Sequence, residues 1–169
     1  FKKLDNFFYT YIDNRFTAEK FAAAFPTMAN PITAGENWGF SQRRNGHGAT
    51  VWGVETAVQR QLDFLPGFLK GFGVYVNYTY TKSSADGVYN GDGEKRTGVT
   101  LPGTAPHMFN ASLSYEHERF SARLSGNYAA AYLDELGDPA FDDRYYDRQF
   151  FLDANASFKL TRQLRVFGE

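Results

Sequence analysis

Cysteine is absent from this sequence of 169 residues, which excludes disulfide frameworks, zinc sites built on thiolates and cysteine nucleophiles. A surplus of positive charge is also missing: 18 Lys and Arg residues face 19 Asp and Glu residues, which argues against binding to nucleic acid. No run approaches the ~18 consecutive apolar residues of a membrane-spanning helix. Aromatic residues are plentiful at 18% and hydrophobic residues make up 43%, so the chain is expected to fold.

A strict alternation of apolar and polar residues is the main pattern in the chain. In residues 120–128, Phe, Ala, Leu, Gly and Tyr alternate with Ser, Arg, Ser and Asn. Successive side chains of an extended strand point to opposite faces, so this pattern predicts a strand with one apolar face and one polar face. The same split predicts strands at residues 52–59, 74–81, 109–115 and 152–160, with partial strands at residues 1–12 and 164–169.

Three features favour a membrane sheet over a soluble sandwich, which would alternate in the same way. The strands have about the 9 to 11 residues that a tilted strand needs to cross a bilayer. Aromatic residues gather near strand ends, where barrels carry girdles: Tyr115, Phe120 and Phe158 at one side, Tyr80, Tyr128 and Tyr132 at the other. The polar face carries charges that suit a water-lined lumen or contact with a plug: Glu55, Arg123, Asp153, Lys159 and Arg165.

Short and long connections alternate along the chain. Residues 116–119 and 161–163 form tight connections and residues 63–70 form a modest turn, whereas residues 13–48, 83–105 and 133–148 are long and polar. Because each strand of a meander reverses direction, the long connections all fall on one edge, which outer-membrane barrels direct outside the cell. The sequence therefore predicts an all-β fold, an antiparallel up-and-down transmembrane β-barrel meander in the bacterial outer membrane.

Several short phrases carry a family resemblance. Residues 49–55 read ATVWGVE, residues 64–73 read FLPGFLKGFG, and residues 101–107 read LPGTAPH before the strand FNASLSYE. DRYYD at residues 143–147 and LDANAS at residues 152–157 complete the run. Together these phrases resemble the C-terminal half of TonB-dependent outer-membrane receptors, over most of residues 45–169.

The resemblance implies a barrel of about 22 strands with a plugged lumen and TonB-coupled import of a scarce nutrient, such as a siderophore–metal chelate or a glycan. The implied partners are outer-membrane lipid, the protein's own plug domain, the TonB complex and a small-molecule or glycan ligand. No cofactor is expected. The 169 residues contain no plug, no energy-coupling box and no last strand ending in an aromatic residue. We therefore expect residues 1–169 to be one partial transmembrane barrel domain of a longer protein.

Two clusters in the predicted outer loops are candidates for ligand binding. Arg43 and Arg44 lie near Trp38 and Phe40, a combination suited to an anionic chelate or to stacking on a sugar. Arg144, Tyr145 and Tyr146 form a similar cluster. The alternative is that these residues belong to surface extensions of strands and bind no ligand.

Metal binding and catalysis have less support in the sequence. His47, His107 and His117 fall in a loop, a strand entry and a tight turn on opposite edges, so a common metal site is not expected. The run 90–94 and the aspartates at positions 138, 142, 143 and 147 suit calcium or a cationic ligand, although turns accumulate aspartate for conformational reasons. No Gly-x-Ser-x-Gly motif is present, and no enzyme activity is expected.

Two other classes of protein remain as alternatives. A small outer-membrane barrel acting as an anchor or adhesin would share these strands without transporting anything. A soluble lipid-binding β-barrel would turn the same apolar faces inward around a ligand cavity. Burial of Val76, Leu124, Ala154 and Ala156 against one another favours the soluble barrel, and their exposure favours the membrane.

Overall fold

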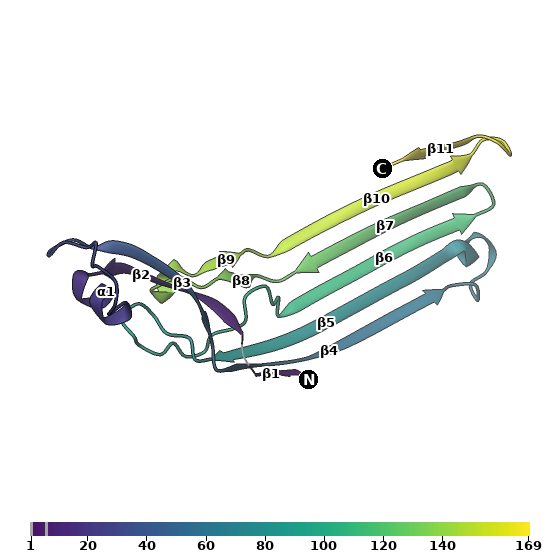
Figure 1. Cartoon of the computed structure of the whole chain (residues 1–169). Coiled ribbons are helices and arrows are strands. Elements are labelled where there is room, and N and C mark those ends of the chain that lie inside the picture. Colours follow the sequence, from purple (N-terminus) through teal and green to yellow (C-terminus); the bar gives the residue numbers. More distant parts are fainter. Residues whose placement is uncertain (1, 6) are drawn as a thin grey trace. The chain divides into compact units, whose positions relative to one another are not determined.

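The structure, a computed structural model, describes residues 2–5 and 7–169 (Figure 1). The chain divides into two compact units, each described by itself. The sheet unit consists of Gly53–Thr81, Ala105–Tyr132 and Asp147–Glu169, and the loop unit consists of Phe1–Trp52, Lys82–Thr104 and Leu133–Tyr146. Among the described residues, no helix has the length and apolar character needed to cross a membrane.

Long antiparallel strands make up the sheet unit. They are β4 (Gly48–Gln61), β5 (Phe72–Asp86), β6 (His107–His117), β7 (Phe120–Ala129), β10 (Gln149–Lys159) and the shorter β11 (Arg165–Gly168). The short strand β1 (Lys2–Leu4) pairs with the first residues of β4, which belong to the loop unit. Within the described chain the sheet has seven strands in the order β1-β4-β5-β6-β7-β10-β11. The predicted antiparallel meander is confirmed.

The register of the sheet places alternating residues of neighbouring strands on common faces. Leu113 of β6 pairs with Val74 of β5 and with Leu124 of β7. One residue along, Ser112 pairs with Ser125 of β7. Paired residues point to the same side of a sheet, and the next pair points to the other side. The strands therefore share one continuous apolar face and one polar face, as the alternation predicts.

The apolar face of the sheet unit is exposed. Val76 and Leu124 are 39% and 45% exposed, and Ala154 and Ala156 are exposed as well. The buried hydrophobic side chains of the described residues all lie in the loop unit instead. Because a water-soluble sheet must cover its apolar face with another layer, these side chains have the exposure of lipid-facing residues. The structure does not support the soluble lipid-binding barrel.

Aromatic side chains form a row near each end of the apolar face. Beside the tight turns, the ring centroid of Tyr115 lies 4.8 Å from that of Phe72 and 6.0 Å from that of Phe120. Towards the other end, Tyr128 pairs with Phe109. From Phe120 to Tyr128 the strand runs about 26 Å at ~3.3 Å per residue. With the usual tilt this covers about 20 Å of depth, close to the apolar band of an outer-membrane barrel.

The short connections of the sheet unit lie at one end of its strands (Figure 1). Glu118 and Arg119 alone separate β6 from β7, and Glu118 has φ +41. Residues 160–164 join β10 to β11, and the 3-10 helix η1 (Gly67–Gly71) lies in the turn between β4 and β5. At their other ends the strands lead into the segments of the loop unit. This arrangement confirms the predicted alternation of short and long connections.

The loop unit has a hydrophobic core of its own. Strand β2 (Phe8–Phe16) pairs with β3 (Trp38–Asn45), and β8 (Tyr132–Glu135) pairs with β9 (Arg144–Tyr146). Helix α1 (Ala18–Ala24) begins after Thr17, whose side chain accepts a hydrogen bond from the Lys20 amide, and the 3-10 helix η2 spans Ala140–Asp142. The core consists of Phe7, Tyr9, Tyr11, Ala49, Ala85, Val88, Val99, Leu133 and Leu136.

Several sequence-based expectations about the connections are wrong. Only residues 2–4 of the strand expected at 1–12 join the large sheet, whereas residues 8–16 form β2 and pair with β3; Phe1 and Asn6 lie outside the described residues. The stretches 13–48 and 133–148, expected to be loops, contain α1, β3, β8 and β9. Tyr132 begins β8, and its place in a girdle stays a prediction. The physical reason is that the alternating apolar side chains of β2 pack into the core of the loop unit. Tyr9 and Tyr11 are buried in this core.

Candidate functional site

A row of polar side chains crosses five strands on the polar face of the sheet unit. Asn77 of β5 donates a hydrogen bond of 2.9 Å to Glu55 of β4 and accepts one of 3.3 Å from Asn110 of β6. Asn110 pairs across strands with Asn127 of β7, which donates a hydrogen bond of 3.4 Å to Asp153 of β10. The row therefore ends in a carboxylate on each side. A carboxylate has about four lone-pair sites, so both ends are able to accept further donors.

All five charged residues expected to face a lumen lie on this polar face. Two of them, Glu55 and Asp153, are the ends of the polar row. Arg123 pairs across strands with Ser114 and Asn155, at the level of smaller polar side chains. Lys159 pairs directly with Arg165 beside the tight turns, which brings two positive charges together. Among the residues that the structure describes, none of the five forms an ion pair. Their contact with a plug stays a prediction.

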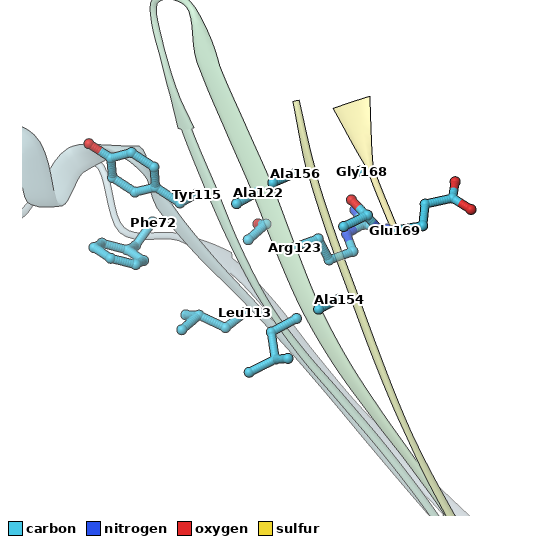
Figure 2. Close-up of a pocket in the computed structure, with 12 residues that line it drawn as sticks. Phe72, Leu113, Tyr115, Ala122, Arg123, Ala154, Ala156, Gly168 and Glu169 are labelled. Carbon is cyan, nitrogen blue, oxygen red and sulfur yellow. The ribbon is translucent and has the colours of Figure 1, made fainter. Parts of the chain in front are cut away.

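The apolar face of the sheet unit contains an open groove of about 510 Å³. The small side chains of Ala122, Ala154 and Ala156 line it between larger neighbours such as Leu113 and Tyr115. In Figure 2 the side chains of Leu113 and Tyr115 project to the same side of the sheet. The side chains around the groove are exposed in the way expected of lipid-facing residues. The groove therefore suits hydrocarbon rather than a water-soluble nutrient.

The first predicted ligand-binding cluster lies on β3 of the loop unit. It comprises Trp38, Phe40, Arg43 and Arg44. The Arg44 guanidinium carbon lies 3.5 Å from the ring centroid of Tyr11, and Phe40 stacks on Phe16 at 4.4 Å. These contacts tie two members of the cluster to β2. Trp38 is 45% exposed, and Arg43 lies on the other face of the strand from Arg44. The cluster therefore lies on a strand, as expected under the alternative that these residues belong to strand extensions. Whether they bind a ligand stays a prediction.

The second predicted cluster lies on β9. Nη2 of Arg144 lies 2.7 Å from a carboxylate oxygen of Asp134 and 2.9 Å from one of Glu135. The hydrogen bond to Asp134 raises the pKa of Arg144. Tyr145 and Tyr146 are 61% and 46% exposed. Sequence reasoning did not include Asp134 and Glu135, because acidic residues on a neighbouring strand follow no fixed spacing from their partner.

An acidic cavity of about 260 Å³ lies in the loop unit. It is lined by Asp13, Asn14, Arg15, Asp92, Asp138, Pro139 and Asp142. Asp138 accepts a hydrogen bond of 2.5 Å from the Gly91 amide, and Asp13 forms an ion pair of 2.7 Å with Lys20. The hydrogen bond that Lys20 donates to Asp13 raises the pKa of Lys20. Asp92, Asp138 and Asp142 were among the sequence-based candidates. Asp13 was not, because it comes from a segment far from them in the chain.

The other predicted acidic residues have structural partners. Asp143 forms an ion pair of 2.6 Å with Arg96, and Asp147 accepts a hydrogen bond from the Arg148 amide. In the part of the chain that the structure describes, no three His, Asp or Glu side chains are grouped so as to hold a metal ion. The acidic residues of the loop unit mainly order its loops.

Long antiparallel strands with one exposed apolar face, one hydrogen-bonded polar face and short turns at one end define the wall of a transmembrane β-barrel. A family model described as "TonB dependent receptor-like, beta-barrel" matches residues 4–169. The chain therefore belongs to the TonB-dependent receptor family, as the resemblance in its sequence implied. No curated protein and no solved structure matches the chain significantly.

Membership of this family decides several of the expectations. TonB-dependent receptor barrels reside in the bacterial outer membrane and act in TonB-coupled transport across it, and they are not enzymes. The outer-membrane localisation and the non-enzymatic class expected from the sequence are confirmed.

Proposed function

We propose that this chain forms part of the barrel wall and of the outer loops of a receptor that imports a scarce nutrient, a metal chelate or a glycan, with energy supplied through TonB. The observation that carries the proposal is the contrast between the faces of the sheet unit. Leu124 and its apolar neighbours are exposed on one face, and the row from Glu55 to Asp153 is hydrogen-bonded on the other. A wall between lipid and a polar lumen requires this contrast.

The loop unit supplies the ligand-selecting part of the proposal. Its exposed aromatic and basic side chains include Trp38, Tyr145, Tyr146 and Arg144. Its hydrophobic core holds the strands that carry these residues. A binding surface on a packed unit loses less conformational entropy on ligand binding than one on free loops.

The rest of the barrel and the plug domain are proposed to come from outside this sequence. Strands β1 and β11 are the edges of the seven-stranded sheet within the described residues. Lipid offers no hydrogen-bond partners to backbone groups at a sheet edge, so a membrane sheet needs both edges paired. The polar-face charges Glu55, Arg123, Asp153, Lys159 and Arg165 are proposed to contact the plug.

Growth under nutrient limitation tests the proposed import. The host strain, a deletion of the complete gene and a TonB-deficient strain would be compared with iron supplied as ferric chelates, and separately with oligosaccharides as carbon source. We expect the deletion strain and the TonB-deficient strain to lose growth on the same nutrient. Equal growth of all three strains on every nutrient, with loss of surface attachment in the deletion strain alone, would favour an anchor or adhesin.

A further inference from the structure

A small polar cavity in the loop unit is lined by Arg43 of the first predicted ligand-binding cluster and by the two carboxylates that Arg144 of the second cluster binds. Its volume is about 210 Å³. Its lining includes Phe8 and Thr10 of β2, Arg43 of β3, and Asp134 and Glu135 of β8. The two carboxylates are those that Arg144 of β9 binds. The fold therefore brings together side chains that lie far apart in the sequence.

The walls of this cavity are held in place by contacts that need no ligand. Thr10 and Arg43 are paired in the register of β2 and β3. Nε of Arg144 donates a hydrogen bond of 2.8 Å to Asp134, and its Nη2 forms ion pairs with Asp134 and Glu135 at 2.7 and 2.9 Å. Leu136, next to Glu135 in the chain, is buried in the core of the unit. A ligand entering the cavity meets a site whose polar groups are already oriented.

The charges around the cavity balance. The positive charges of Arg43 and Arg144 match the negative charges of Asp134 and Glu135. Arg43 forms no ion pair with any described residue, so its planar donors are available to a ligand. A multiply charged anion would meet the carboxylates, and a cation would meet Arg43. The lining favours a neutral ligand that carries both hydrogen-bond donors and acceptors.

Phe8 adds an apolar contact surface to this polar lining. Its side chain is 70% exposed, so its ring is accessible to a ligand in the cavity. An aromatic ring offers a flat, apolar face for the C–H face of a sugar ring, while planar guanidinium and carboxylate groups bridge pairs of neighbouring hydroxyls. The cavity is smaller than the about 300 to 1,000 Å³ of typical drug-sized ligand sites, so it suits one ring of a longer ligand.

We infer that this cavity is a subsite for one sugar ring of a neutral oligosaccharide. Phe8 stacks on the ring, Arg43 donates to its hydroxyl oxygens, and Asp134 and Glu135, oriented by Arg144, accept from its hydroxyl groups. This inference rests on the proposed import function and narrows its substrate class to glycans. It predicts that the receptor binds sugar before any transport takes place.

Binding by the purified full-length receptor in detergent tests the subsite. The probes are an array of neutral oligosaccharides covering glucans, xylans, mannans, galactans and chitin, with a ferric catecholate chelate and oligogalacturonate as charged comparisons. We expect a neutral oligosaccharide to bind. Phe8→Ala and Arg43→Ala should each weaken its binding by about tenfold, the loss expected when one anchoring contact worth about 1.4 kcal/mol is removed.

Phe141→Ala is the matched control, because Phe141 is 86% exposed in the same unit and does not line the cavity. It should change the affinity by less than about twofold. Heat-modifiable migration in gels confirms that each variant is folded. The inference is overturned if no neutral oligosaccharide binds, if only a charged probe binds, or if both cavity variants bind as tightly as the control.

The same experiments separate this inference from the proposed function. Sugar binding that depends on Phe8 and Arg43, without TonB-dependent uptake of that sugar, supports the subsite and contradicts the import of that ligand. TonB-dependent uptake of a metal chelate, with no sugar binding, supports the import function and overturns the subsite.

Discussion

Two ion pairs of the loop unit differ in burial, and burial decides what each contributes. The side chains of Arg96 and Asp143 are 13% and 7% exposed, and both guanidinium nitrogens bond the carboxylate at 2.9 and 2.6 Å. The Arg144 side chain is 66% exposed where it meets Asp134. A buried charge that loses its partner keeps its desolvation cost, whereas an exposed charge is rehydrated.

Arg96→Ala should therefore destabilise the loop unit far more than Arg144→Ala. We expect the first substitution to cost about 3 to 5 kcal/mol because Asp143 is left buried without a cation. The second should have little effect on stability, because the exposed charges are rehydrated. Hydrogen exchange of the loop segments in the full-length receptor measures both effects, and similar protection in the two variants would contradict this account.

The charged residues on the polar face permit a second prediction at the scale of residues. If Arg123 contacts the plug, Arg123→Glu should loosen the plug and admit a large antibiotic such as vancomycin through the outer membrane. Arg119→Glu is the control, because Arg119 lies in the tight turn between β6 and β7. Greater vancomycin sensitivity for the first variant alone is expected, and equal sensitivity of the two variants would argue for a lumen-hydrating role.

At the scale of elements, the two faces of β7 are chemically distinct although their residues alternate one by one. Leu124 pairs with Leu113 and Ala154 on the apolar face, and Ser125 pairs with Ser112 on the polar face. The alternation of the sequence was sufficient to predict this, because the period of two is a property of the extended backbone. The role of β2 was not predictable in the same way, because a strand that faces a packed core and one that faces lipid alternate alike.

Charged substitutions on β7 test the face assignment. Leu124→Arg should cost about 2 to 4 kcal/mol, because the guanidinium would lie near the middle of the apolar band. Ser125→Arg, one residue along and on the polar face, should cost little. The measurement is the denaturant midpoint of the full-length receptor refolded into lipid vesicles. Equal losses for the two variants, or a larger loss for Ser125→Arg, would refute a lipid-facing Leu124.

At the scale of the whole molecule, the hydrophobic effect acts differently in the two units. The loop unit buries its apolar side chains in a core, whereas the sheet unit keeps apolar side chains such as Val76 and Leu124 exposed. The loop unit is therefore expected to be stable in water, and the sheet unit requires lipid on one face. This contrast explains why one chain combines features of soluble and membrane proteins.

The open edges of the sheet lead to a prediction for residues 1–169 expressed without additional strands. We expect this chain not to form a folded species with heat-modifiable migration after refolding into detergent, because unpaired backbone groups at β1 and β11 have no partners there. The full-length receptor treated in parallel should show such a species. A stable heat-modifiable form of the 169-residue chain would overturn the proposal that strands from outside this sequence complete the barrel.

The amino-acid sequence by itself determined the main strands, their two faces, the end that carries the tight turns and the family, because alternation and turn composition are local properties of the chain. The tertiary structure decided which strands share a sheet, so that β2 pairs with β3 and leaves the large sheet. It also decided which side chains meet, such as Arg43 with Asp134 and Glu135 around one cavity. Such contacts depend on segments distant in sequence packing together, and no local pattern encodes a partner that lies ninety or more positions away.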